Sequence, residues 1–120
     1  MVVVEQDWKI QEDTVLRPDI SLICDEINKK YIIKTPLIVV EIVSSSSSKR
    51  DEVYKFDIYQ AEKAPYYILV YPDDLKAKIY KLEKGKFSKQ GDFTTEKFIF
   101  DDLKCKAKID FENVFEKFKK

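Results

Sequence analysis

The sequence predicts a single α/β (α+β) domain, and two observations carry that prediction. Residues 37–43 and 66–71 are apolar runs of strand length, and residues 49–63 between them repeat apolar side chains at helical spacing. Residues 110–118 repeat apolar side chains in the same way and predict a C-terminal helix. A strand, a helix and a strand of these lengths form a crossover unit, so we expect the two runs to lie side by side in one sheet.

Length and composition agree with one domain over residues 1–120. A chain of 120 residues, 44% of them hydrophobic, can bury one compact core but hardly two. No apolar stretch reaches the ~20 residues of a membrane span, and no signal pattern opens the chain. The two cysteines, Cys24 and Cys105, have neither metal-ligand spacing nor a disulfide-rich context. We therefore expect a cytoplasmic protein with reduced thiols.

Two strands are predicted before the central run. Val2, Val3 and Val4 predict a strand that starts almost at the first residue. Pro18 suits the first position of a second strand, in which apolar and polar side chains alternate from residue 19 to residue 23. Asp19 is then expected to point away from the face that carries the apolar side chains.

The central run contains an ionisable side chain, Glu41, among Ile and Val residues. So dense an apolar run is typical of a strand covered on both faces. Burying a polar group without partners costs roughly 2–7 kcal/mol. Glu41 therefore needs a metal ion, a cation or an exit to a pocket at the carboxyl end of the strand.

The helix that follows is predicted to begin with a capping box, Ser48-x-x-Asp51. Tyr54, Ile58 and Ala61 fall on one face by spacing and are expected to pack on the sheet. Asp51, Lys55 and Tyr59 are expected to form a polar stripe along the edge of that face.

The last third of the chain predicts a hairpin, short strands and a helix. Residues 76–82 and 86–89 flank the turn 83–85. Residues 98–100 and the stretch 103–107 can add short strands or a turn. Asp110 is a capping residue for a helix whose apolar side chains are spaced by three and four, namely Phe111, Val114, Phe115 and Phe118.

Composition also limits the chemistry. The chain has no histidine, which excludes Ser-His and Cys-His nucleophiles, His-ligated zinc and histidine bases. Residues 1–75 carry 9 Lys and Arg against 14 Asp and Glu, a net charge of −5, and residues 76–120 carry 13 against 8, a net charge of +5. The basic half can offer a face to a polyanion. Solvated edge strands, protected by lysines from pairing with other chains, are the stronger explanation.

Asp19 and Glu41 are the candidate functional pair, because neighbouring strands can bring the two carboxylates together. Two carboxylates and the backbone carbonyl of Ile42 are oxygen ligands of the kind that Mg2+ prefers. Lys55 can reach over from the helix to orient a water or to neutralise a phosphate. The alternative is structural: Asp19 ends a turn, Glu41 lies at a strand exit, and Lys55 pairs with Asp51 or Tyr59.

These stretches resemble, in the same order, a known family. The resemblance rests on Pro18-Asp19-Ile20, on Val40-Glu41-Ile42-Val43-Ser44, and on Arg50-Asp51 followed by Lys55, Tyr59 and Ala64-Pro65. It is to the Uma-two family of restriction-endonuclease-like proteins, within the PD-(D/E)XK nuclease superfamily, and extends from about Val2 to Phe115.

The resemblance implies a mixed sheet flanked by helices. It implies that Asp19, Glu41 and the Ile42 carbonyl hold the metal, and that Lys55 replaces the superfamily's lysine, whose usual position is Val43 here. Relatives usually carry a further N-terminal helical segment, which we expect this chain to lack. Since an uncovered apolar sheet face favours association, a homodimer is the expected state.

The function implied is that of an endonuclease that uses Mg2+ (or Mn2+) to hydrolyse phosphodiester bonds in DNA, with Asp19, Glu41 and Lys55 as its catalytic residues. Tyr59, Lys49 and Arg50 would contact the substrate backbone. The alternative is a catalytically inactive module of the same fold that binds nucleic acid or protein.

Overall fold

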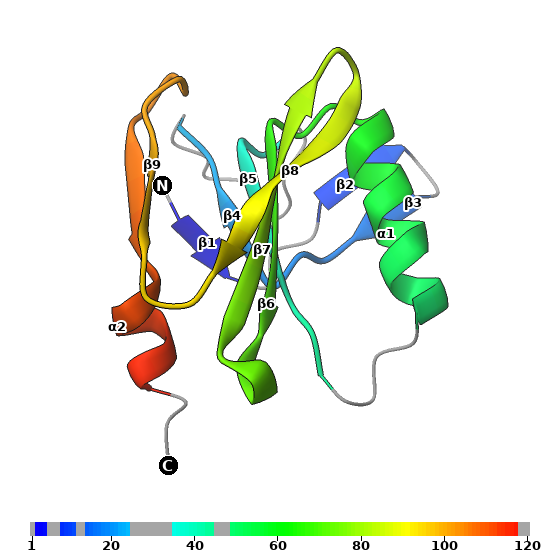
Figure 1. The fold of residues 1–120 in the computed structure, drawn as a ribbon. Helices are drawn as coiled ribbons and strands as arrows, with labels where there is room; N and C mark the ends of the chain where they lie inside the picture. The colour runs from blue at the N-terminus through cyan, green and yellow to red at the C-terminus, as the bar shows by residue number, and fades with distance from the viewer. Residues whose placement is uncertain (1, 5–7, 12–13, 25–34, 45–48, 118–120) are drawn as a thin grey trace.

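The structure is a computed structural model that describes residues 2–4, 8–11, 14–24, 35–44 and 49–117 (Figure 1). Within these ranges, six strands form a sheet in the order β1-β4-β5-β6-β7-β8. They are β1 (Val2–Val4), β4 (Ile20–Leu22), β5 (Ile38–Ile42), β6 (Tyr66–Tyr71), β7 (Lys76–Glu83) and β8 (Lys86–Phe93). β5 and β6 are parallel, and the other neighbouring pairs of this described sheet are antiparallel. The α+β class and the mixed sheet are confirmed.

The predicted crossover unit lies at the centre of this sheet. Helix α1 (Lys49–Ala61) follows β5 and leads back to β6, the parallel neighbour of β5. A short 3-10 helix, η1 (Pro72–Asp74), then joins β6 to β7. The crossover predicted at 37–71 is therefore confirmed, and it leaves Glu41 directly opposite Leu69 in the register of the two parallel strands.

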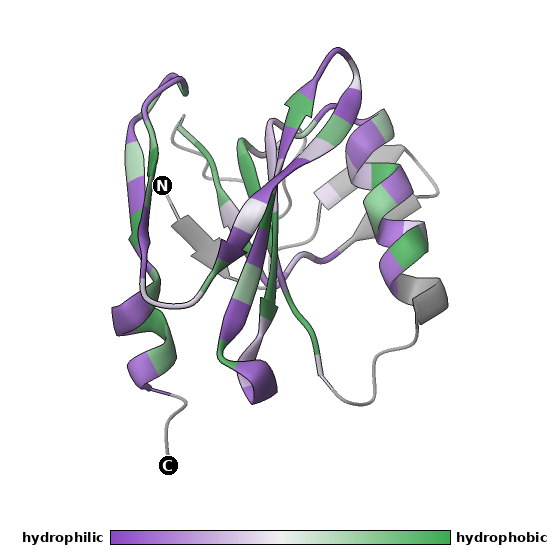
Figure 2. Ribbon diagram, in the orientation of Figure 1, coloured by the Kyte–Doolittle hydropathy of each residue, from purple (hydrophilic) through white to green (hydrophobic). Residues whose placement is uncertain are grey.

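Two further layers cover the sheet, one on each face. Helix α1 and the hairpin of β2 (Trp8–Gln11) and β3 (Thr14–Leu16) lie on one side (Figure 1). The antiparallel pair β9 (Lys97–Phe100) and β10 (Ala107–Asp110), with helix α2 (Phe111–Glu116), lies on the other. We call these sides the α1 face and the α2 face. Apolar segments concentrate in the sheet, while α1 and β8 carry many hydrophilic residues (Figure 2).

Alternation along the strands gives each face its own core. Side chains of β5 at 38 and 40 belong to the core of the α2 face, and those at 39 and 41 point to α1. The core of the α2 face is Ile38, Tyr66, Ile68, Val70, Ala77, Ile79, Phe100, Phe111 and Phe115. The core of the α1 face is Trp8, Ile23, Val39, Tyr59, Ala64, Tyr67 and Leu69.

The predicted orientation of α1 is wrong. Tyr54 is 56% exposed, whereas Tyr59, predicted in the polar stripe, has no exposed surface. Phe56 packs on the same core from this helix. The reason lies in β5, because Glu41 faces the helix and draws Lys55 and Tyr59 inward as hydrogen-bond partners. The capping box at 48–51 lies outside the described residues and side chains.

The C-terminal part of the chain follows its prediction. β7 and β8 form the hairpin, and both loop residues, Lys84 and Gly85, have positive φ angles (51° and 81°), as a type I′ turn requires. The Asp110 side chain caps α2 by accepting hydrogen bonds from the amides of Glu112 and Asn113. The predicted packing is confirmed by the burial of Phe111 and Phe115. Phe118 lies outside the described residues.

The prediction of reduced thiols is wrong, because Cys24 and Cys105 form a disulfide. Their sequence separation of 81 residues gave no sign of pairing, but the fold brings their Cα atoms to 5.5 Å, an ordinary disulfide distance. Cys24 follows β4 in the sheet, and Cys105 lies between β9 and β10. The bond therefore ties the covering layer of the α2 face to the sheet.

The α2 face also contains an apolar cavity of about 390 Å³. Its walls include Ile20, Val40 and Ile42 from the sheet and Ala107, Phe111 and Val114 from the opposing layer. Among the described residues, no helix combines the length and the apolar character that a membrane crossing needs.

Candidate active site

The site is built around Glu41, a carboxylate with only 5% of its surface exposed. The period-two alternation of β5 directs its side chain to α1, while Val40 and Ile42 point to the opposite face. Glu41 is the penultimate residue of the strand. A charged group is thus held inside the protein but close to the carboxyl end of a central strand.

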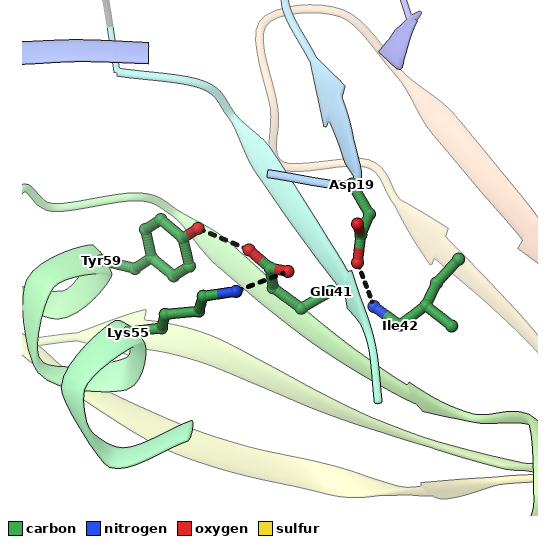
Figure 3. A network of polar contacts seen from close by, with 5 residues as sticks. All are labelled: Asp19, Glu41, Ile42, Lys55 and Tyr59. Atoms are coloured by element: carbon green, nitrogen blue, oxygen red, sulfur yellow. Dashed lines mark hydrogen bonds and ion pairs between the residues drawn. The ribbon is translucent and has the colours of Figure 1, made fainter. Parts of the chain in front are cut away.

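Helix α1 supplies two partners, one to each oxygen of Glu41 (Figure 3). The Tyr59 hydroxyl donates a hydrogen bond of 2.6 Å to Oε1. The Lys55 Nζ lies 3.3 Å from Oε2 as both a hydrogen bond and an ion pair. Lys55 and Tyr59 can act together because residues four apart lie on the same side of a helix, one turn apart.

The environment of Glu41 raises its pKa above the ordinary value. Burial is the main cause, because it disfavours the charged form. The Tyr59 hydrogen bond and the Lys55 charge oppose this shift, and the Asp19 carboxylate adds to it. Asp19 and Glu41 are therefore close enough to repel each other. A bound cation would relieve this repulsion.

Asp19 is placed by the antiparallel pairing of β4 and β5. Ile20 is opposite Val40 in the register, so Asp19, which precedes β4, arrives beside the end of β5. There its Oδ2 accepts a hydrogen bond of 2.7 Å from the backbone amide of Ile42 (Figure 3). The Asp19 side chain thus bridges the two strands at the residue that follows Glu41.

Tyr59 is held from both sides by aromatic rings. Its ring stacks on Trp8 of β2, with centroids 5.7 Å apart and an interplanar angle of 8°. Tyr67 meets it edge-on at 5.1 Å. Burial and the neighbouring Glu41 charge raise the pKa of Tyr59. Its hydroxyl therefore stays protonated and keeps a hydrogen to donate to Glu41.

The predicted site residues thus have different outcomes. Glu41 lies against Lys55, and Asp19 is near enough to affect the pKa of Glu41. Tyr59, predicted to contact the substrate backbone, has no exposed surface here, and its hydroxyl is bonded to Glu41. Lys49 and Arg50 lie in the first turn of α1, and their side chains are outside the described part of the structure.

Sequence reasoning missed Trp8 altogether. It lies on a short strand far from the motifs, and only its burial against Tyr59 connects it to Glu41. The one available signal was that a lone tryptophan in a chain of 120 residues is usually buried.

The donor atoms suit a hard cation. The Asp19 and Glu41 side chains and the Ile42 carbonyl offer only oxygen, and Mg2+ takes one or two carboxylates and completes its shell with water. Within the described residues, no three Asp, Glu, His or Cys side chains gather into a metal-binding group. The two described carboxylates and the carbonyl would thus suit a partly hydrated ion.

The fold and the site together define a class of α+β proteins. In this class, two carboxylates and a lysine lie at the carboxyl end of a central strand in a mixed sheet. The chain belongs to the Uma2 family, whose model is described as "Putative restriction endonuclease" and matches residues 1–102. This match confirms the resemblance to the Uma-two family. No curated protein has significant sequence similarity to the chain.

A solved structure has the same fold. It is the crystal structure of a protein from Anabaena variabilis ATCC 29413, described as a "putative nuclease belonging to DUF820". The two structures align with a TM-score of 0.70 and 16% sequence identity, over 98% of this chain and 69% of the other. At 16% sequence identity, the similarity shows that the two proteins share a fold and nothing more.

Proposed function

We propose that this protein is a Mg2+-dependent endonuclease that hydrolyses phosphodiester bonds in DNA. The observation that carries the proposal is a buried carboxylate, Glu41, that lies near a second carboxylate and 3.3 Å from a lysine at the end of a central strand. A buried acid with a raised pKa is costly to the fold, and such costs are typical of functional sites. Membership of the Uma2 family supports a nuclease reaction.

Each residue then has a distinct role. Asp19 and Glu41 hold the cation together with the Ile42 carbonyl, and Asp19 also fixes the Ile42 amide. A bound Mg2+ supplies Lewis acidity and a more acidic water near neutral pH. The Lys55 side chain is 38% exposed. It can therefore turn from Glu41 to a phosphate oxygen and stabilise the charge that develops there.

Titration calorimetry with Mg2+ and Mn2+ tests the site directly, followed by nicking of a supercoiled plasmid. We expect Glu41→Gln to abolish metal binding and nicking together, since the amide keeps the shape but loses the charge. Asp57→Asn is the matched control, because Asp57 is an exposed carboxylate on the same helix and its substitution changes the net charge equally.

Lys55→Met separates metal binding from assistance to phosphodiester hydrolysis. It should retain metal binding and lose nicking by about 100-fold or more, as for other positioned charged groups. Metal binding by the wild type without nicking would point to the inactive module. An absence of metal binding by the wild type would refute the proposed nuclease.

A further inference from the structure

We infer that Tyr59 determines the cation specificity of the site, by keeping one oxygen of Glu41 for the protein and leaving the other for the metal. The inference rests on the proposed function, in which Glu41 holds a divalent cation. It makes Tyr59 a positioning residue that selects Mg2+ over Ca2+ without touching either ion.

The two oxygens of Glu41 have different surroundings. Oε1 accepts a hydrogen bond of 2.6 Å from the Tyr59 hydroxyl in the buried part of the site. Oε2 faces the Lys55 ammonium, which is itself partly exposed. A cation can displace an exposed ammonium far more easily than a buried hydroxyl. Oε2 is therefore the oxygen through which Glu41 would bind a metal.

The Tyr59 hydroxyl has little freedom to move away. Its ring is stacked on Trp8, and both residues have at most 1% of their surface exposed. Tyr67 contacts the Tyr59 ring edge-on from a second direction. Because cores are close-packed, a ring held in this way cannot rotate without displacing its neighbours. Trp8 and Tyr59 thus fix Glu41 from the α1 face.

A carboxylate with one committed oxygen is a monodentate ligand. Mg2+ accepts such ligands readily, because its octahedral shell is small and keeps several waters. Ca2+ takes six to eight oxygens and gains from bidentate carboxylates. Holding Oε1 therefore penalises Ca2+ more than Mg2+. Releasing Oε1 from Tyr59 should therefore favour the binding of Ca2+.

The test is calorimetric titration of the whole chain with Mg2+ and with Ca2+, for wild type and Tyr59→Phe at one pH. We expect the ratio of the two dissociation constants to shift toward Ca2+ by about fivefold, because the freed Oε1 is an oxygen ligand that Ca2+ uses more readily than Mg2+. Both cations bind the same ionised carboxylate, so the ratio cancels any change in the protonation of Glu41.

Tyr67→Phe is the matched control, because it removes a hydroxyl from the same aromatic cluster that makes no hydrogen bond to another described residue. It should leave the ratio unchanged. Circular dichroism checks that each variant is folded. If Tyr59→Phe does not fold, Trp8→Phe loosens the stack and should give a smaller shift in the same direction.

The outcomes separate the two proposals. An unchanged ratio in Tyr59→Phe, or an equal shift in Tyr67→Phe, overturns the specificity role and leaves the nuclease proposal in place. A wild type that binds neither cation overturns both.

Discussion

Strand β5 contributes to both faces of the sheet, and the two faces are packed by different chemistry. On the α1 face its side chain at position 41 is a carboxylate held by Lys55 and Tyr59. On the α2 face Ile38, Val40 and Ile42 line an apolar cavity of about 390 Å³. One strand therefore lines a polar site on one face of the sheet and an apolar pocket on the other.

The α1 face is specified by geometry. The hydrogen bond of Tyr59 and the ion pair of Lys55 require Glu41 to point at α1, and a shift by one residue would turn it into the apolar cavity. The burial cost of an unpaired carboxylate opposes such a shift. The polar network thus fixes the register of β5 as well as building the site.

The α2 face depends on burial and on a covalent bond. Most of its contacts are apolar and non-directional, although the Tyr66 hydroxyl of the sheet donates a hydrogen bond of 2.8 Å to Asp102 of the covering layer. The disulfide between Cys24 and Cys105 ties the β9–β10 layer to the sheet. The comparison teaches that a buried polar network holds the face with the candidate site, whereas apolar burial and a cross-link hold most of the other face.

The largest expected effect comes from removing the cross-link. Cys24→Ser should lower the free energy of unfolding by about 4 kcal/mol under oxidising conditions, because the bond closes a loop of 81 residues in the unfolded chain. Urea denaturation with and without reductant measures this. Reductant should destabilise the wild type and leave the variant unchanged; equal stability of the two oxidised proteins would mean that burial alone holds the α2 face.

A smaller effect is expected on the α1 face, from Glu41→Gln. The pKa of Glu41 is raised in the folded protein, so the native state binds more protons than the unfolded chain between the unfolded and folded pKa values. Stability contributed at low pH is therefore lost as the pH rises above the ordinary pKa of 4.5. The Gln variant lacks this loss.

As the pH rises from 4 toward 7, Glu41→Gln should thus gain stability relative to the wild type, because only the wild type must bury an ionised carboxylate. Urea denaturation at several pH values measures the difference, with Asp57→Asn as the exposed control. Parallel pH profiles for wild type and Glu41→Gln would show that burial does not penalise the charge.

The sheet, the crossover and the C-terminal helix could be predicted from the sequence, because each follows from local periodicity and capping residues. Sequence reasoning also found Glu41, since a carboxylate within an apolar run has few harmless explanations. It predicted the wrong buried face of α1. The spacing of Tyr54, Ile58 and Ala61 favours one face, but the hydrogen bonds of Glu41 turn the face with Tyr59 toward the sheet. Trp8 and the Cys24–Cys105 bond were out of reach, as both depend on contacts between segments distant in sequence.

The smallest expected effect distinguishes two tyrosines on the α1 face. Tyr59 and Tyr67 are both buried and their rings touch, yet only the Tyr59 hydroxyl is bonded to Glu41. Among the described residues, nothing accepts from or donates to the Tyr67 hydroxyl. A buried polar group without a partner destabilises the fold. Tyr67→Phe should therefore leave stability unchanged or raise it by up to about 1 kcal/mol.

The same deletion at Tyr59 removes a bond to a charged group and should lower stability. Thermal and urea unfolding of both variants measure the contrast, and a loss of stability in Tyr67→Phe equal to that in Tyr59→Phe would mean that the bond to Glu41 gives the Tyr59 hydroxyl no special contribution.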